Sequence, residues 1–416
     1  MTTLPATRPS VAASRPAVRP CPTCRAVAVE PVHRLRLRTP EGHPLQGGYD
    51  VVSCLRCGTG FADAVHDAGY YDRYYAELAK YATEASARPG GITAQAAEPA
   101  WVRARFEQTV DQLELLLADR SARVLDVGCA NGSLLGVLAG RGYRDVRGVD
   151  PSPLSARAAA EAGLRVEVGT FAAMPAGLGT FDVVCATGVL EHLWDVEGAM
   201  ATLVGLMTPG GAIYVEVPDA SRYVDPYIAP FQDFGTEHVN HFSGPTLRRL
   251  GARFGLETLW EVPLDSELAP GATCAGRAVA WRSAGAAGSG DADAARDVHL
   301  VDALVEFTRR SRVDFERLEA VLEQQLAGED RFAVWGFGEL AMKLLALPPL
   351  ASRRLAALVD ANPSRHGIAI GSTRVGPPAD LPEGVPVVVA SYLSQRAIVD
   401  QIGALGLANR VIVPPR

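Results

Sequence analysis

No apolar stretch in this sequence of 416 residues approaches the roughly 18 residues that a membrane-spanning helix needs. Basic residues are not in excess either, since 40 Lys and Arg stand against 47 Asp and Glu, and the net charge of −7 argues against a general electrostatic grip on nucleic acid. Seven cysteines are too few and too clustered for a disulfide framework. These absences predict a cytoplasmic protein without a membrane partner.

The N-terminal segment has the composition of a disordered tail followed by a small module that needs a metal. Residues 1–17 contain arginines and prolines but no apolar h-region, which disfavours a targeting peptide. Residues 18–65 contain two Cys-x-x-Cys pairs separated by 29 residues, formed by Cys21, Cys24, Cys54 and Cys57. Four thiolates can enclose a tetrahedral Zn²⁺, and a site filled by four protein ligands is structural. A redox motif and incidental buried cysteines are the alternatives.

Apolar strands alternate with helical stretches between residues 123 and 218, which indicates a parallel α/β sheet. The small polar residues of 283–295 predict a linker. We therefore divide the chain into a tail (1–17), a zinc-binding module (18–65), a central α/β domain (66–282), a linker (283–297) and a C-terminal Rossmann-like α/β domain (298–416).

A glycine-rich run, Val124-Leu-Asp-Val-Gly-Cys-Ala-Asn-Gly132, ends a predicted strand and opens a helix. Missing side chains let a ligand approach the backbone there, and the amide hydrogens of a helix start face an anionic group. Asp150 ends the next strand 24 residues after Asp126, where a carboxylate can accept both ribose hydroxyls of an adenosine ligand. NAD is the competing ligand, but its Gly-x-Gly-x-x-Gly fingerprint is missing from this run.

This run is similar to the S-adenosylmethionine (SAM) binding motif of class I methyltransferases. The segments Phe181–His192 and Leu206–Val215 resemble later motifs of that family, in order and at fitting spacing. The resemblance implies a central class I Rossmann-like domain whose cofactor-binding residues are Asp126, Gly128, Cys129, Asn131, Gly132, Asp150 and Glu191. Methyl transfer to carbon or hydroxyl also needs a base near the cofactor, for which His192 and His238 are candidates; a wall of the cofactor site and a structural histidine are the other readings.

The whole arrangement resembles a family of sugar C-methyltransferases that act on nucleotide-linked keto-deoxysugars in natural-product pathways. The features that carry the likeness are the two cysteine pairs, the SAM motif, Glu237-His238 with Phe242-Ser243, and a C-terminal Rossmann-like stretch from Val334 to Asp360. The likeness implies His238 as the general base, Glu237 as its partner in orienting the acceptor, and Tyr75 or Tyr81 of a tyrosine-rich lid near the substrate.

Two features depart from that family's pattern. Gly235 stands where members often carry a tyrosine two residues before the glutamate, and the C-terminal stretch reads Trp335-Gly-Phe-Gly-Glu-Leu-Ala341. The turn Gly336-Phe-Gly338 with Asp360 is a weak signal for a second nucleotide site, and a substrate-holding domain without its own cofactor is the preferred interpretation.

Other functions stay open from the sequence. The acceptor could be another small molecule methylated on oxygen or nitrogen. An RNA methyltransferase that uses the zinc module and the basic residues of the first 40 to grip phosphates is a weaker hypothesis, as is a non-catalytic SAM-binding module. A small-molecule acceptor, with a nucleotide-sugar first, is the expected partner, and the sequence does not fix the oligomeric state.

Overall fold

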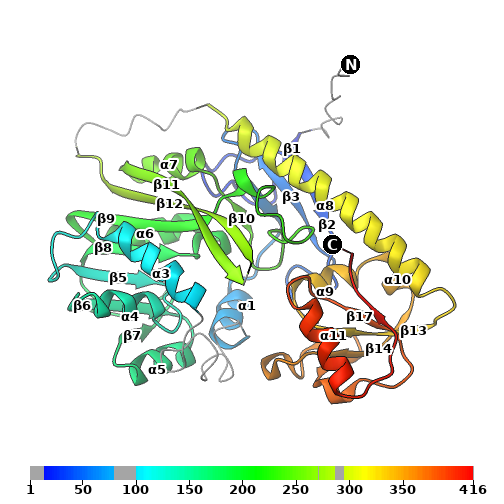
Figure 1. The fold of residues 1–416 in the computed structure, drawn as a ribbon. Helices are drawn as coiled ribbons and strands as arrows, with labels where there is room; N and C mark the ends of the chain where they lie inside the picture. Colours follow the sequence, from blue (N-terminus) through cyan, green and yellow to red (C-terminus); the bar gives the residue numbers. More distant parts are fainter. Residues whose placement is uncertain (1–13, 79–99, 270, 286–294, 416) are drawn as a thin grey trace, which may run out of the picture.

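The computed structural model describes residues 14–78, 100–269, 271–285 and 295–415. These residues form three sheets, and a long helix, α8 (Val298–Gln325), runs along the first sheet toward the C-terminal domain (Figure 1). No helix among these ranges is long and apolar enough to cross a membrane. Tyr81, one of the two predicted lid tyrosines, lies outside the described residues.

The N-terminal sheet is antiparallel and takes its last strand from the central part of the chain. Its order is β1 (Arg15–Pro16), β2 (Ala28–Leu35), β3 (Tyr49–Cys54), β4 (Gly60–Asp63) and β10 (Asn240–His241). The prediction of a disordered tail to residue 17 is wrong for β1, because Arg15 pairs with Asp50 and Asp63 and holds this short strand on β2.

The central sheet is a doubly wound α/β sheet, which confirms the predicted alternation. Its strand order is β11-β12-β9-β8-β5-β6-β7. Pairs from β9 to β7 are parallel, and β12 runs antiparallel to both of its neighbours. The strands are β5 (Arg123–Val127), β6 (Asp145–Asp150), β7 (Arg165–Val168), β8 (Phe181–Thr187), β9 (Met207–Pro218), β11 (Leu256–Ala269) and β12 (Ala272–Ser283).

The chain winds from β5 toward β7 on one side and from β8 toward β11 on the other, so the direction switches between β5 and β8. Ligands of open α/β sheets bind beyond the carboxyl ends of the strands at such a switch point. The helices of this part are α3 (Ala100–Leu113), α4 (Ser133–Gly140), α5 (Pro153–Glu161), α6 (Val196–Leu206) and α7 (Gly244–Arg253). The short helical turns η2 (Leu190–His192) and η3 (Ala220–Arg222) come after β8 and β9.

The C-terminal domain repeats this construction with the order β15-β16-β14-β13-β17-β18, and its switch point lies between β13 and β17. Only β15 and β16 pair antiparallel in this sheet. Its elements are β13 (Arg331–Trp335), α9 (Glu339–Leu344), α10 (Pro348–Ala351), β14 (Arg354–Val359), η5 (Pro363–Arg365), β15 (Ala369–Ile370), β16 (Thr373–Gly376), η6 (Pro378–Asp380), β17 (Val387–Val389), α11 (Gln395–Ala404) and β18 (Val411–Ile412).

One hydrophobic core joins the two ends of the molecule. Leu35 and Tyr49 of the N-terminal sheet belong to the same buried cluster as Phe234 and as Phe332 and Leu344 of the C-terminal domain. Helix α8 lies in this cluster through an apolar face of Leu300, Leu304, Phe307, Leu318 and Leu322. The C-terminal domain is therefore packed on the N-terminal sheet rather than tethered to it.

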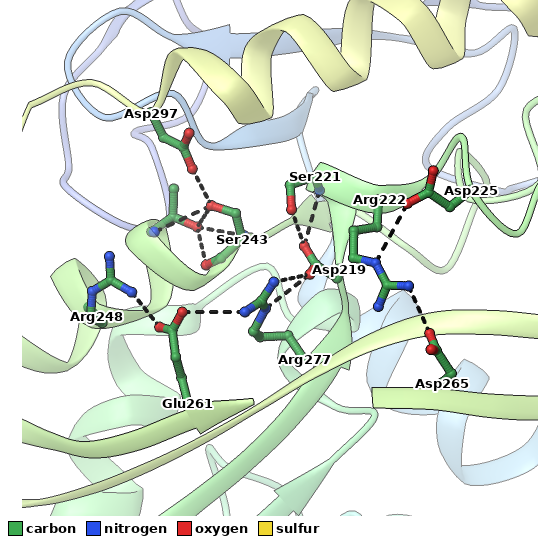
Figure 2. A network of polar contacts seen from close by, with 11 residues as sticks. Asp219, Ser221, Arg222, Asp225, Ser243, Arg248, Glu261, Asp265, Arg277 and Asp297 are labelled. Atoms are coloured by element: carbon green, nitrogen blue, oxygen red, sulfur yellow. Dashed lines mark hydrogen bonds and ion pairs between the residues drawn. The ribbon is translucent and has the colours of Figure 1, made fainter. Parts of the chain in front are cut away.

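Separate groups of polar contacts fix the start of α8 and hold β12 of the central sheet (Figure 2). Arg277 on β12 donates two hydrogen bonds to one oxygen of the fully buried Asp219, at 3.0 and 2.5 Å. Asp297 caps α8 by accepting from the amide of Leu300, and its second oxygen accepts the hydroxyl of Ser243, which itself caps α7. The amide of Asp297 also donates to the carbonyl of Cys57. These contacts tie α7, α8 and the cysteine turns together.

Arg19 connects the N-terminal sheet to the central part. Its guanidinium is buried, donates to the carbonyls of Ala62 and Val239 and to Oδ1 of Asn240, and lies over the ring of Trp194. Burial lowers the pKa of Arg19 to about 10, so the group stays charged near pH 7. The guanidinium of Arg19 thus holds β4 and the segment before β10 in register through its N–H donors.

We expect Arg19→Lys to lower the stability of the protein by about 2 kcal/mol, because an ammonium group cannot reach three acceptors in this fixed geometry. Thermal unfolding followed by calorimetry measures the change. Arg36→Lys, at an exposed position after β2, is the matched control and should unfold at the wild-type temperature. Equal unfolding temperatures for the two variants would contradict the assigned role of Arg19.

Candidate functional site

The glycine turn after β5 lies at the switch point of the central sheet. Gly128 has φ of +82°, and a Cβ there would lie 2.7 Å from a methyl group of Val189. Ala130 also has a positive φ, of 47°, and its amide donates to Oδ2 of Asp150 at 2.8 Å. Gly132 precedes α4 without a side-chain cap, so the first amides of α4 point out of the turn. The turn can receive a carboxylate there.

The predicted cofactor residues come together around this turn. Asp126, Cys129, Asn131, Asp150 and Glu191 are all buried at the carboxyl ends of β5, β6 and β8. Asp150 accepts two backbone amides, from Ala130 and from Ser152, which fixes both of its oxygens. Its carboxylate therefore has a set orientation before any ribose hydroxyl reaches it.

Asp126 is the most strongly perturbed acid of this group. Burial raises its pKa to about 8, and the neighbouring charges of Asp150 and Glu216 add to the effect. Its Oδ1 is buried without a hydrogen-bond partner in the described part of the chain. SAM carries a sulfonium and an ammonium group, so a buried unpaired carboxylate in this turn fits a cationic ligand.

The two Glu-His pairs meet beside the turn. Nδ1 of His192 lies 3.1 Å from the carbonyl oxygen of Glu237, and the rings of His192 and His238 are 4.8 Å apart. The amide of Val239 donates to the carbonyl of Glu191 at 2.8 Å. Since the carbonyl of Glu237 only accepts, Nδ1 of His192 carries the proton and Nε2 is left to face Glu191, 3.8 Å away.

His238 is neutral in this site, although its lowered pKa also makes it a weaker base than a free imidazole. It is half-buried, and burial lowers its pKa far below the usual value, with the nearby His192 adding to the effect. The imidazole is therefore neutral near pH 7 and carries a free lone pair. Glu191, His192 and His238 also offer ligand atoms within 4.8 Å of one another, so the same three groups could hold a divalent ion.

Tyrosines of α1 (Ala68–Arg73) and of the adjoining π-helical turn η1 (Tyr74–Leu78) lie against these pairs. The ring of Tyr75, one of the two predicted lid tyrosines, is 5.9 Å from that of His192, and its hydroxyl is buried without a hydrogen-bond partner in the described residues. The hydroxyl of Tyr74 donates to Oε1 of Glu237. Tyr74 is not among the residues predicted from the sequence. It lies in the same tyrosine-rich run as Tyr75, and that run is the sequence feature from which it could have been found.

Two further groups were missed because they come from distant parts of the chain. Glu339, in the first turn of α9, accepts from the amide of Thr236 at 2.8 Å and also from its hydroxyl. Lys343, one turn later, is buried and donates to the carbonyl of Phe231 at 2.8 Å. No local pattern in the sequence indicates that α9 reaches the Glu237-His238 segment.

The four cysteines of the N-terminal sheet form a compact buried cluster. Sγ of Cys21 lies 3.5 Å from that of Cys57, and Sγ of Cys24 lies 3.5 Å from that of Cys54. All four sulfurs are within 4.8 Å of one another, and none forms a disulfide. Thiolates at about 2.3 Å from a tetrahedral Zn²⁺ are about 3.8 Å apart, so the cluster has the size that such a site needs.

Comparisons with known proteins agree with the central part of this description. A family model described as "Methyltransferase domain" matches residues 101–261. The ubiquinone biosynthesis O-methyltransferase of Methylocella silvestris is 38% identical over 98 residues, which cover 22% of this chain and 38% of that protein. The protein of the same name from Thiobacillus denitrificans is 32% identical over 151 residues, which cover 33% of this chain and 65% of its own length. The chain thus spans less than two thirds of either relative.

Solved structures align with a part of the chain only. The magnesium protoporphyrin IX methyltransferase of Synechocystis, with bound SAM, is 19% identical and covers 52% of this chain and 98% of its own, with a TM-score of 0.36. A SAM-dependent methyltransferase from Mesorhizobium loti is 18% identical and covers 41% of this chain and 96% of its own, with a TM-score of 0.34. The family match over residues 101–261 confirms the predicted SAM-dependent methyltransferase domain.

The perturbed pKa of Asp126 predicts how cofactor binding depends on pH. A cation in the turn favours the ionised carboxylate, so below pH 8 binding must release a proton from Asp126. Affinity for S-adenosylhomocysteine should therefore rise between pH 6 and 8, by at most about tenfold per pH unit. Titration calorimetry in buffers of different ionisation enthalpy measures both the affinity and the proton release.

Asp126→Asn supplies the control for this experiment, because it keeps the shape of the side chain and removes its titration. The amino group of the ligand titrates in both proteins and cancels in the comparison. Proton release that is the same in wild type and variant would show that Asp126 is already ionised in the free protein.

Proposed function

We propose that the chain methylates a carbon atom of a nucleotide-linked keto-deoxysugar, with His238 as the general base. The observation that carries this proposal is the position of His238, whose ring lies 4.8 Å from that of His192 and whose ring nitrogens lie close to the carboxylate of Glu191. A carbon atom next to a keto group becomes a nucleophile only after it loses a proton. A neutral base that lies next to the methyl donor meets that need.

Bound SAM supplies the electrophilic methyl group in this proposal. The residues of the chain do the rest: His238 takes the α-proton, and Tyr74 fixes Glu237 so that its carboxylate can orient the acceptor. His192 is held by the carbonyl of Glu237 and forms the wall between the acceptor and the cofactor turn. Asp150, locked by two amides, is the expected partner of the ribose hydroxyls.

A nucleotide-linked acceptor is supported by the way the C-terminal domain faces this site. Glu339 begins α9 directly after β13, at the switch point of the C-terminal sheet, and it contacts Thr236 beside the catalytic pair. Arg365, at the end of η5 after β14, is close enough for its charge to oppose the raised pKa of Tyr74. A cation near the lid is suited to a diphosphate.

The relatives favour a second candidate, methylation of an oxygen atom. Both curated relatives are named ubiquinone biosynthesis O-methyltransferases. A hydroxyl acceptor would also lose its proton to His238, so the same residues serve either reaction. The two candidates differ in whether a carbon-bound proton leaves the acceptor.

Deuterium exchange distinguishes the two functions. We expect the enzyme with S-adenosylhomocysteine bound to exchange the α-proton of dTDP-4-keto-6-deoxyglucose in D₂O, because proton removal precedes methyl transfer to carbon. Proton NMR of the sugar tracks the exchange. Turnover of a phenolic acceptor without exchange in the keto-sugar would favour the O-methyltransferase.

His238→Ala should lower methyl transfer by roughly 10²–10⁴-fold, the usual contribution of a positioned general base. Its affinity for S-adenosylhomocysteine should stay at the wild-type value, because His238 belongs to the acceptor side of the site. His299→Ala, at an exposed position on α8, is the matched control. Turnover near the wild-type rate in His238→Ala would show that His238 is not the general base.

The cysteine cluster is proposed to hold one structural Zn²⁺ per chain. Its four buried sulfurs lie within 4.8 Å of one another, and they join the turn before β2 to the turn after β3, where the carbonyl of Cys57 accepts from the amide of Asp297. Since all four ligands come from the protein, zinc here would stabilise the fold and take no part in methyl transfer.

Cys54→Ser should lose this zinc and unfold at a lower temperature than wild type, since a structural site contributes its binding energy to folding. Plasma mass spectrometry of protein purified without chelators measures the metal content. Cys274→Ser, on β12 and outside the cluster, should keep one zinc per chain. Wild-type protein without zinc would refute the assignment.

A further inference from the structure

Glu339 occupies a space that the sequence of the neighbouring loop leaves open. Gly235 has no side chain, and a Cβ at this position would lie 2.6 Å from Oε2 of Glu339. The two features that depart from the sugar C-methyltransferase pattern, Gly235 and the Gly-Phe-Gly-Glu turn, therefore touch each other in the fold. The carboxylate of the C-terminal domain stands where a side chain of the Glu237-His238 loop would otherwise lie.

Only one oxygen of this carboxylate accepts a hydrogen bond from the described residues. Oε1 accepts from the amide and the hydroxyl of Thr236, whereas Oε2 is buried and has no hydrogen-bond partner among the described residues. The nearest cation, the ammonium of Lys343, is 3.9 Å from Oε2 and donates to the carbonyl of Phe231. Burial raises the pKa of Glu339, as expected for a carboxylate that lacks a full set of donors.

The loop does not depend on Glu339 alone for its position. The hydroxyl of Tyr49 donates to the carbonyl of Gly235 at 2.7 Å, and that of Tyr71 donates to the carbonyl of Thr236 at 3.1 Å. Both carbonyls are thus fixed from the N-terminal part of the chain. The side chain of Glu339 is 32% exposed, so it borders on solvent, and its buried Oε2 is left for a further hydrogen-bond donor.

We propose that Glu339 is an acceptor-binding residue, whose Oε2 accepts a hydrogen bond from a hydroxyl or amino group of the acceptor. This inference rests on the proposed function for the place of the acceptor beside Glu237 and His238. It makes the C-terminal domain a determinant of specificity: acceptors with a hydrogen-bond donor on the side of the Gly235 loop are selected, and analogues with an ether or a hydrogen in that place are rejected.

The test uses Glu339→Gln, which keeps the shape and the acceptor for Thr236 but places an amide NH₂ at the position of Oε2. Gly235→Ala tests the same contact from the other side, because its Cβ displaces the carboxylate. Glu323→Gln, on the exposed face of α8, is the matched control. We would measure kcat and KM for dTDP-4-keto-6-deoxyglucose, the affinity for S-adenosylhomocysteine, and thermal unfolding of the ligand-free protein.

The expected result is a KM at least tenfold higher in Glu339→Gln and in Gly235→Ala, with the wild-type affinity for S-adenosylhomocysteine. Ligand-free Glu339→Gln should unfold close to the wild-type temperature, because the amide oxygen keeps the hydrogen bonds from Thr236 and Lys343 keeps its hydrogen bond to the carbonyl of Phe231. A wild-type KM, or a clear drop in unfolding temperature, would overturn the inference and make Glu339 a structural link.

Failure of the proposed function gives a different result. Wild-type protein that binds S-adenosylhomocysteine but neither methylates the keto-sugar nor exchanges its α-proton would refute that function. The unfolding temperature of Glu339→Gln then decides the inference by itself, since a ligand-binding role predicts no loss of stability and a structural role predicts a loss.

Discussion

The pairing of β4 with β10 is the contact on which the rest of the site depends. Two residues of the central part, Asn240 and His241, extend a sheet that is otherwise built from the N-terminal segment. The amide of Ala62 donates to the carbonyl of Val239, and Arg19 grips the same carbonyl. Because His238 directly precedes this junction, the cysteine-bearing sheet sets the position of the proposed base. Stability of the N-terminal sheet and activity are therefore linked, although no cysteine lies at the Glu-His pairs.

The two α/β sheets have the same hydrogen-bond arrangement at their switch points, an aspartate that accepts two backbone amides. In the central sheet Asp150 accepts the amides of Ala130 and Ser152, and in the C-terminal sheet Asp360 accepts those of Phe337 and Asn362. The first amide of each pair belongs to the glycine turn, so each acid fixes the turn that precedes it in the sequence. This shared arrangement explains why both segments give a nucleotide-binding signal. The helix starts beyond both turns lack a side-chain cap, and they differ in that the first turn of α9 carries the acid Glu339, whereas the first turn of α4 carries no acid.

Features governed by local sequence were predicted well, and features governed by distant contacts were not. The alternating strands that include β5, β6 and β8, and the glycine turn, result from periodicity and from the residues that end each element. The cysteine cluster results from spacing, and the four sulfurs do meet. By contrast, β10 is two residues long, and it exists only because β4 offers a free edge. Nothing near residue 240 in the sequence indicates that partner.

The same reasoning applies to the site. The Glu-His pairs carried their own signal, and the fold brings them together. The choice between Tyr74 and Tyr75 depends on the turn of η1, which places the hydroxyl of Tyr74 on Glu237 and the ring of Tyr75 on His192. The composition of a tyrosine-rich run does not determine which of its tyrosines faces Glu237 and which faces His192. Glu339 could not be predicted for another reason. Its contact with Gly235 joins residues more than a hundred positions apart, and it is possible only because glycine has no side chain there.

Electrostatics connects the cofactor to the base. Asp126 and Glu191 each keep a buried carboxylate oxygen without a partner among the described residues, and burial raises the pKa of both groups. Such groups destabilise the free protein, and a cationic ligand offsets that cost when it binds. His238 is held neutral in the same region, where a protonated imidazole would compete with the ligand for these acids.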